Sequence, residues 1–509
     1  MAQKGSLSLS ASVISYKGAK MDVVPEIVLL DGQDAVEVDG TTVTAKKAGQ
    51  AHALLRATQV IDSGRRYDMY SQPITIEVAG DNGGDNGGNN GGDNGGNNGG
   101  DNGGDNGTPS TLPGHTSGGT AGSIQANDGK ADADELKKSF AANNQVQVDF
   151  TGDTVVLPAA GLIDASRAGG KTLTVAGNRM AYTLPLSALK LDEWAQQFGG
   201  QVNDLNLRIT VGRLAAGDAA AVSSAVTAAG GKLAAEAVKL GAEVSGKDGK
   251  AVAVGLENSK VSRVWTLDGI LDPGKATVVR YDPQTGRLQF VPATFGTLGG
   301  QAIVTIKSGG DGVYAVVASN RSFADLPAGH WAKADIELLA NKLVVNGVSE
   351  NRFDADRSVT RAEFAALVAR ALGLASANAN GVFGDVQDAD WYADAVAAAA
   401  QAGILGGYED GTFRPNREIT REEMAAMLIR AMKYAGIDLN LSAAQRDEAL
   451  APFKDANATG WAKSELAAAV QTGLINGKTA DMLEPNGVAT RAQSAVMLKR
   501  LLTRASFIN

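Results

Sequence analysis

The chain of 509 residues contains no cysteine. It can therefore form no disulfide and no thiolate metal site, and it has no cysteine nucleophile. Histidine is also scarce, since His52, His115 and His330 are the only three and lie in different segments. No apolar run approaches the ~18 residues that a membrane-spanning helix needs. These absences predict a protein without cofactor, metal site or membrane span.

Positive charge is outnumbered as well. The chain has 47 Lys and Arg against 56 Asp and Glu, a formal net charge of −9 and a pI near 5.1. A nucleic-acid-binding protein usually presents a basic face, so no nucleic-acid partner is expected. The first residues, Met1 to Gly5, lack the apolar core of a secretory signal. If the protein acts outside the cell, we expect this sequence to be a fragment or to have lost its leader.

Length and patterning predict several domains, because one core rarely serves so many residues. Residues 1–79 alternate apolar and polar positions, for example at Val36 and Val38, which is typical of strands. The segment from Val36 to Gly49 resembles bacterial Ig-like domains of group 2, which implies an N-terminal β-sandwich. Residues 80–107 contain 14 Gly, 9 Asn and 5 Asp and nothing else. Such a segment buries no apolar area, so a flexible linker is predicted over 80–130.

Residues 131–320 are predicted to form an α+β region, as one domain or two small ones. Helices are expected at 187–198 and 215–240. Alternating runs predict strands at 171–175, 205–211, 276–281, 288–292, 302–306 and 313–317. The residues of this region do not indicate what it does.

A unit of about 60 residues then recurs three times. Trp331, Trp391 and Trp461 are 60 and 70 residues apart, and so are the Thr-Arg pairs that begin at Thr360, Thr420 and Thr490. The ten extra residues fall in the last link, around 439–448. Each unit has the periodicity of a helix, a glycine-bearing loop and a second helix. A repeat that keeps its internal spacing while its links vary is a structural unit used three times.

The second helix of each unit begins with a capping signature. Thr360 with Glu363, Thr420 with Glu423, and Thr490 with Gln493 have the spacing at which the two side chains satisfy free N–H groups at a helix start. The arginine between them is not explained in this way, because a cation there opposes the helix dipole. Its recurrence indicates either a bound anion, which a guanidinium grips well, or a structural contact between helices.

Three more recurring residue types allow two interpretations each. The tryptophans pack in the core or offer a flat face to a sugar ring. The aspartates cap turns or reach a sugar hydroxyl, and the glycines supply positive φ or admit a ligand close to the backbone. The predicted binding residues are Arg361, Arg421, Arg491, Trp331, Trp391, Trp461, Asp325, Asp385, Asp455, Gly347, Gly407 and Gly477.

The pattern Phe-x-Asp, Trp, helix, the loop 407–416 and the run Ile419 to Glu423 resembles the S-layer homology module. The resemblance covers repeat 1 (322–376), repeat 2 (381–437) and repeat 3 (451–505). It implies an all-α, pseudo-threefold assembly whose grooves bind secondary cell-wall polysaccharide on peptidoglycan, often through pyruvylated N-acetylmannosamine. The arginine, aspartate, tryptophan and glycine of the motif line those grooves in the family. Repeat 3 departs most from the pattern, with Gln493 and the loop 481–485, so the groove at Arg491 matches the family least well.

These observations predict a non-catalytic, extracellular surface protein held on the cell wall, with self-association in an S-layer as a further expectation. A nucleophile elbow and the HExxH metal motif are both absent from the sequence. Two alternatives stay open. Residues 131–320 could be a glycan hydrolase tethered by the same anchor, because carboxylate pairs are not visible in a sequence. The N-terminal domain could also act as an adhesin.

Overall fold

The computed structural model describes two parts of the chain. Before residue 80 it describes residues 6–8, 11–14, 20–23, 26–29, 35–39, 41–60, 66–70 and 74–78. From there on it describes residues 122–509 except 178, 257–260, 299, 308–309, 375–376, 378–380 and 459. The chain divides into two compact units, one of residues 1–58 and 73–112 and the other of residues 59–72 and 113–509.

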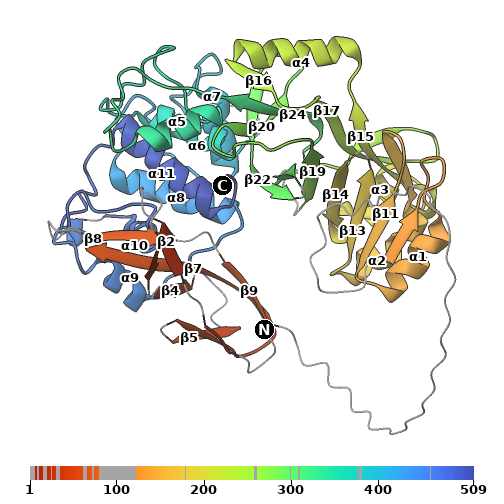
Figure 1. Cartoon of the computed structure of the whole chain (residues 1–509), viewed down its shortest axis with the longest axis horizontal. Coiled ribbons are helices and arrows are strands. Elements are labelled where there is room, and N and C mark those ends of the chain that lie inside the picture. Colours follow the sequence, from red (N-terminus) through yellow and green to blue (C-terminus); the bar gives the residue numbers. More distant parts are fainter. Residues whose placement is uncertain are drawn as a thin grey trace, which may run out of the picture. The chain divides into compact units, whose positions relative to one another are not determined.

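Short strands make up the described residues before position 80 (Figure 1). They are β1 (Ser6–Ser8), β2 (Ala11–Ile14), β3 (Lys20–Val23), β4 (Glu26–Leu29), β5 (Val36–Asp39), β6 (Thr42–Ala45), β7 (Gly49–Val60), β8 (Arg66–Tyr70) and β9 (Ile74–Val78). Strands β5 and β6 pair antiparallel with Val36 opposite Ala45, and both residues are buried. The predicted strand character is confirmed, while the Ig-like arrangement stays a prediction.

The predicted linker extends too far toward the C-terminus. Residues 80–121 lie outside the described residues, but Gly122–Gln125 form strand β10, which pairs in parallel with β11 (Gln145–Asp149). Ile124 on this strand is buried. The prediction of a linker up to residue 130 is therefore wrong from residue 122 onward, because a single apolar side chain among polar neighbours was enough to seat a strand at the sheet edge.

The middle region contains two sheets around a shared core. The first has the order β10–β11–β13–β14–β19–β23–β22, with parallel pairing from β10 to β13 and antiparallel pairing beyond. The second has the order β12–β15–β17–β24–β20–β21 and is antiparallel, with β16 on β24 and β18 on β17. Buried residues of both sheets belong to one hydrophobic cluster. The shared core shows a single α+β body rather than two small domains.

The bounds of the middle strands and helices are as follows. The strands are β12 (Thr154–Pro158), β13 (Thr172–Gly177), β14 (Met180–Pro185), β15 (Asn206–Arg213), β16 (Gly231–Leu233), β17 (Val238–Ser245), β18 (Ala251–Ala253), β19 (Ser262–Leu267), β20 (Ala276–Tyr281), β21 (Leu288–Val291), β22 (Ala293–Leu298), β23 (Gln301–Ile306) and β24 (Gly312–Ser319). The helices are α1 (Ala133–Ala142), α2 (Ile163–Ala168), α3 (Leu191–Gln197) and α4 (Ala216–Ala228). All six predicted strands exist. The helix predicted over 215–240 ends at Ala228, because Val238, Leu240 and Ala242 alternate into the core as strand β17.

Paired helices form the C-terminal region, drawn in teal to blue in Figure 1. Repeat 1 has α5 (Lys333–Asn341) and α6 (Arg361–Ala371), repeat 2 has α7 (Ala393–Gln401) and α8 (Arg421–Tyr434), and repeat 3 has α10 (Lys463–Gln471) and α11 (Arg491–Arg504). The longer link between repeats 2 and 3 contains one more helix, α9 (Ala443–Leu450). The helix–loop–helix prediction is confirmed. The first helices end just before Leu343, Gly403 and Gly473, which have positive φ.

The three repeats close into a ring. The second helix of each repeat packs on the first helix of the next, as α6 on α7, α8 on α10 and α11 on α5. Isolated β-bridges follow the same order, between Thr360 and Glu418, Thr420 and Val488, and Ser358 and Thr490. One hydrophobic cluster runs through all three repeats. The repeats therefore share a core and fold as one body.

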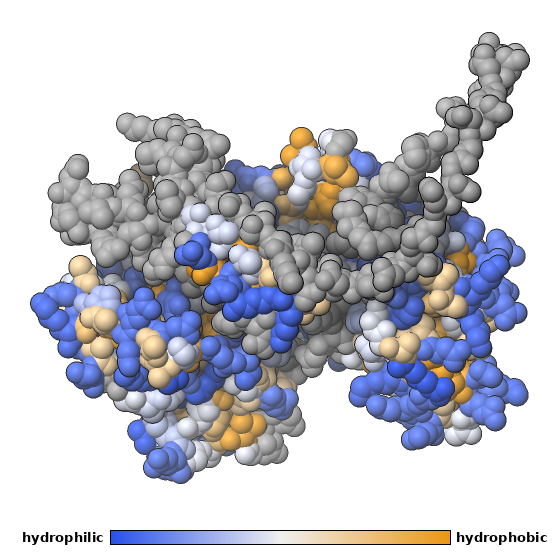
Figure 2. All heavy atoms as spheres, turned by 90° about the horizontal axis from the view of Figure 1, so that it is seen from below, coloured by the Kyte–Doolittle hydropathy of each residue, from blue (hydrophilic) through white to orange (hydrophobic). Residues whose placement is uncertain are grey.

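The ring and the middle region are joined by polar contacts. The amide of Ala293 donates to the carbonyl of Phe507, and the side chain of Asn509 bonds both backbone groups of Phe295. The Lys342 ammonium donates to two backbone carbonyls of the middle region. Figure 2 shows a mostly hydrophilic face with scattered hydrophobic patches. Among the described residues, every helix is too short or too polar to cross a membrane.

Candidate functional site

Each second helix starts with the predicted capping box. The hydroxyls of Thr360, Thr420 and Thr490 accept from the amide three residues on, and the side chain at that position accepts from the threonine amide. The neutral Gln493 makes this second bond at 3.1 Å. The capping predictions are confirmed in all three repeats, and the arginine that follows each threonine is thereby held at the first position of its helix.

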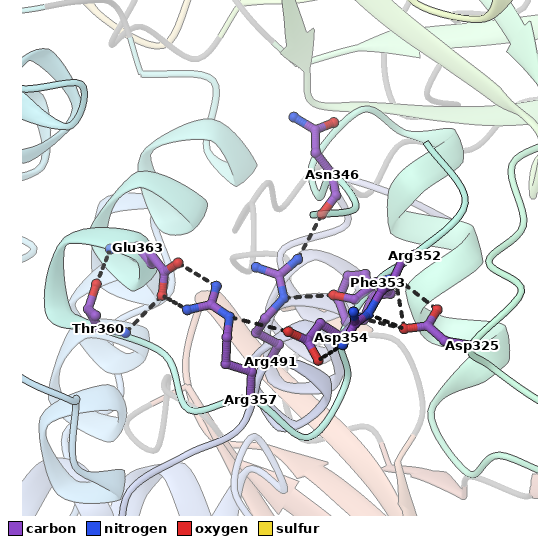
Figure 3. A network of polar contacts seen from close by, with 9 residues as sticks. All are labelled: Asp325, Asn346, Arg352, Phe353, Asp354, Arg357, Thr360, Glu363 and Arg491. Atoms are coloured by element: carbon purple, nitrogen blue, oxygen red, sulfur yellow. Dashed lines mark hydrogen bonds and ion pairs between the residues drawn. The ribbon is translucent and has the colours of Figure 1, made fainter. Parts of the chain in front are cut away.

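That arginine reaches into the next repeat. Figure 3 shows Arg491 of repeat 3, whose Nε donates to the carbonyl of Phe353 at 2.9 Å and whose Nη2 donates to the carbonyl of Asn346 at 2.8 Å. The guanidinium also lies over the Phe353 ring, 4.6 Å from its centroid. Both contacts are with repeat 1, so Arg491 links repeat 3 to repeat 1 and closes the ring of repeats.

The other two arginines repeat this geometry. The contacts are Arg361 to the carbonyls of Phe413 and Gly406 at 2.9 and 3.3 Å, and Arg421 to those of Leu483 and Asn476 at 2.7 and 2.5 Å. Arg361 and Arg421 are buried, and Arg491 is half-buried. Burial lowers the pKa of all three side chains from the ordinary arginine value. An arginine nevertheless stays charged near neutral pH. The structural interpretation thus accounts for two of the three nitrogens of each guanidinium.

The third nitrogen distinguishes the three sites. Nη1 of Arg361 forms an ion pair with Glu423 at 3.1 Å, and both side chains are almost fully buried. At Arg421 the residue equivalent to Glu423 is the uncharged Gln493. At Arg491 the equivalent Glu363 forms its ion pair with Arg357 at 2.6 Å, and its charge acts on Arg491 without an ion pair between the two. Within the described part of the chain, Nη1 of Arg421 and of Arg491 thus lacks a hydrogen-bond partner.

The aspartates hold the loop that the arginines contact. Asp325 accepts from the amides of Phe353 and Asp354, and Asp354 has a φ of +63°. Asp385 and Asp455 make the same pair of bonds to loops whose second residues also have positive φ. Burial raises the pKa of Asp325, but these amide bonds outweigh it and leave the pKa below the ordinary value. The carboxylates therefore stabilise a turn with a positive φ, as the capping interpretation expects. Each aspartate and the turn that it caps are 28 residues apart along the chain.

The glycines are required because a Cβ atom would not fit, and not because of their φ angle. Gly347, Gly407 and Gly477 are not among the residues with positive φ, so that interpretation is wrong. A Cβ at these positions would lie 2.8, 2.6 and 2.5 Å from Cε1 of Phe323, Phe383 and Phe453 respectively. The aromatic ring of the Phe-x-Asp pattern thus packs directly on the loop backbone, and no larger residue fits there.

The tryptophans lie on the surface. Trp331, Trp391 and Trp461 are 63, 68 and 60% exposed, so the core interpretation is wrong for all three. An exposed indole at an equivalent place in each repeat leaves a flat apolar face with an N–H donor open to solvent. That is the arrangement a sugar-binding platform requires.

A second recurring arginine escaped the sequence analysis. Arg370, Arg430 and Arg500 follow the first arginine by nine residues in every repeat, and the same 60- and 70-residue spacing could have revealed them. Arg370 and Arg500 each donate to a backbone carbonyl just past a first helix, at 3.0 and 3.4 Å. Arg430 pairs with Glu465 at 3.4 Å and lies over the Trp461 ring, 5.7 Å from its centroid. Arg430 of repeat 2 therefore lies beside the tryptophan of repeat 3.

Each candidate site is therefore assembled from neighbouring repeats. Arg491 of repeat 3 meets the loop of repeat 1, where Asp325 holds Phe353 and Asn346 precedes Gly347 (Figure 3). Trp391 of repeat 2 lines the same cleft as Asn346. The predicted arginine, aspartate and glycine positions come together in space from neighbouring repeats.

Comparison with known proteins identifies the C-terminal region. The S-layer homology domain family matches residues 322–365, 382–425 and 452–495. Similar proteins include an amylopullulanase of Thermoanaerobacterium thermosulfurigenes (34% identical; 47% of this chain and 12% of the relative), an exoglucanase of Acetivibrio thermocellus (38%; 35% and 16%) and an S-layer protein of Bacillus thuringiensis subsp. finitimus (33%; 37% and 22%). This chain thus carries three S-layer homology domains, and it spans less than a quarter of the length of these relatives.

Proposed function

Since three S-layer homology domains form its C-terminal part, we propose that the protein is a non-catalytic surface protein anchored to the cell wall. The ring of repeats binds secondary cell-wall polysaccharide on peptidoglycan without a covalent bond. The acidic group of the polymer, such as a pyruvate ketal, meets the arginine at the start of a second helix. The location that follows is extracellular, at the wall or in an S-layer.

The third guanidinium nitrogen is the observation that carries this proposal. In Arg421 and Arg491 two nitrogens are fixed on backbone carbonyls, and the carboxylate that pairs with Arg361 has no counterpart at Arg421 and is diverted at Arg491. A guanidinium fixed in this way is preorganised for a carboxylate, because the ordering of the side chain has already taken place. The sites at Arg421 and Arg491 are therefore the main binding sites, and the site at Arg361 is largely self-neutralised.

The tryptophans add the apolar part of recognition. A pyranose ring has flat C–H faces, and each exposed indole offers a surface for such a face. The charge selects the acidic residue of the polymer, and the aromatic surface supports its ring.

Alanine at each arginine of the full chain tests the proposal, with binding to purified wall sacculi measured by co-sedimentation. We expect Arg421→Ala and Arg491→Ala to weaken binding by about tenfold or more each, since a charge-assisted hydrogen bond is lost. Arg361→Ala is the matched control. It removes the same kind of hydrogen bonds between repeats, but the charge of Arg361 is already paired with Glu423. We expect it to lower the melting temperature with a smaller effect on binding. If binding falls equally in all three variants and follows their melting temperatures, the arginines act only as structural ties.

A wall-anchored enzyme is the second candidate, and the relatives motivate it. An amylopullulanase and an exoglucanase share similarity with this chain, so an S-layer homology region can accompany catalytic domains. On this alternative residues 131–320 would hydrolyse glycans. Release of reducing sugars from wall glycans by the full chain would favour it over the non-catalytic proposal. Self-association in a lattice is a further proposal, which the S-layer relatives support. An adhesin role for an Ig-like N-terminal domain is a proposal that rests on the sequence alone.

A further inference from the structure

An open cleft lies between the middle region and the first two repeats. Its volume is about 940 Å³, at the upper end of the range of small-molecule sites. One wall is the β20–β21 hairpin with the end of α4, and the other is formed by α6 and the start of α7. The cleft is large enough for a short oligosaccharide.

Arginines dominate the polar lining of this cleft. Four line it against three aspartates, whereas the whole chain has a formal net charge of −9. Two of the aspartates already accept hydrogen bonds, Asp282 from the hydroxyl of Thr285 at 2.6 Å and Asp311 from the amide of Ala242 at 3.0 Å. These bonds leave the carboxylates charged, so the four arginines exceed the three aspartates by one charge, a small positive excess on an acidic protein that favours an anionic ligand.

Two side chains on opposite walls offer what an acidic sugar needs. Arg287 on the hairpin is exposed, and among the described residues its guanidinium forms no hydrogen bond or ion pair with another side chain. Trp391, two residues before α7, is 68% exposed. The first supplies paired donors for a carboxylate or phosphate, and the second supplies a flat face for a ring.

The cleft adjoins the binding site at Arg491. The carbonyl of Asn346 accepts from Nη2 of Arg491 at 2.8 Å, and Asn346 also lines the cleft. In Figure 3 the side chain of Asn346 points away from Arg491. Asn346 is therefore shared, with its carbonyl on the Arg491 side and its residue in the lining of the cleft.

We propose that this cleft is an extended glycan subsite, in which the middle region binds the acidic sugars adjacent to the residue held at Arg491. The inference rests on the proposed wall-polysaccharide function. It gives the middle region a role in polymer recognition, with Arg287 as the residue that binds the acidic group and Trp391 as the platform for a sugar ring in the cleft. The ring of repeats would then bind the end of the polysaccharide, and the cleft would bind the sugars next to that end.

Fragments of the wall polymer of one repeating unit and of several units test this, with binding to the full chain measured by calorimetry. We expect the longer fragments to bind more tightly than the single unit. Arg287→Ala should weaken binding of the long fragments by about three- to tenfold, the range for one charge-assisted contact at a partly exposed site. It should leave binding of the single unit unchanged. Removing the acidic groups from the long fragments should abolish the difference between the two proteins.

Arg213→Ala is the matched control, because Arg213 is an exposed arginine at the end of β15 that does not line the cleft. An equal loss in both variants would mean that only the overall charge matters, and the subsite would be disproved. The same follows if Arg287→Ala binds long fragments as the unchanged chain does while Arg421→Ala is impaired. If the unchanged chain binds no fragment at all, the wall-anchoring proposal fails together with this one.

Discussion

Three residues of each repeat cooperate within a few ångströms. In repeat 2 the ring of Phe383 lies on Gly407, while Asp385 holds the amides of Phe413 and Arg414. An aromatic ring thus packs against one side of the loop, and a carboxylate accepts hydrogen bonds from its backbone on the other. The carbonyls that Arg361 contacts belong to this same loop, so the shape of the loop decides whether the ring of repeats can close.

Gly407→Ala tests this packing. The new Cβ would lie 2.6 Å from Cε1 of Phe383 and 2.8 Å from the carbonyl oxygen of Thr412. We expect the free energy of unfolding to fall by about 1–3 kcal/mol, as overpacking of a tight site generally costs. Chemical denaturation of the full chain measures it. Gly406→Ala is the control, since a Cβ there meets no atom within 4 Å and its φ is not positive. Equal stability of the two variants would contradict the packing role.

At the scale of the helices, the repeats differ at the residue three positions after the capping threonine. Glu423 satisfies its own threonine amide and pairs with the arginine of the preceding repeat. Gln493 satisfies its threonine amide equally but brings no charge. The helix start is therefore capped in both cases, and the difference falls on the neighbouring arginine.

Gln493→Glu should convert the Arg421 site into a copy of the Arg361 site. A carboxylate at this position keeps the capping bond and neutralises Nη1 of Arg421, so we expect polymer binding to weaken by about tenfold with no loss of stability. Binding to sacculi and thermal unfolding measure the two effects. Glu423→Gln is the reciprocal variant and should strengthen binding at Arg361. Unchanged binding in both variants would remove Nη1 from the recognition mechanism.

At the scale of the whole C-terminal body, Lys342 connects the ring of repeats to the middle region. Its side chain is buried, donates to the carbonyls of Pro273 and Ala276, and lies 5.0 Å from the centroid of the Phe295 ring. Burial lowers the pKa of this ammonium to about 8, with Asp272 opposing the shift. An unfolded lysine titrates near 10.4.

This difference predicts a pH dependence with a definite sign. Between about pH 8 and pH 10.4 the unfolded chain keeps the proton that the folded chain has lost, so the unfolding free energy rises with pH. The rise amounts to at most about 1.4 kcal/mol per pH unit for one group. Lys342→Met should lack this contribution while other groups titrate as before. Denaturation of both proteins across this range measures it, and identical pH profiles would show that Lys342 is not the source.

Much of the C-terminal architecture could be predicted from local patterns. The three repeats, their helix pairs, the capping boxes and the position of the extra segment all follow from spacing and from side chains within about one turn of each other. The middle strands were also recognisable by their alternation. The edge strand β10 was missed because it is short and has a single buried apolar side chain, Ile124, which gives no alternating pattern.

The contacts that make the candidate site depend on the folded arrangement. Arg361, Arg421 and Arg491 reach partners 52, 62 and 138 residues away, and spacing along the chain cannot say which repeat supplies them. The exposure of the tryptophans, the steric role of the glycines and the cleft beside Asn346 likewise arise from packing between repeats and with the middle region. Local patterns are readable because they act between near neighbours, whereas a binding site is a property of surfaces that meet only after folding.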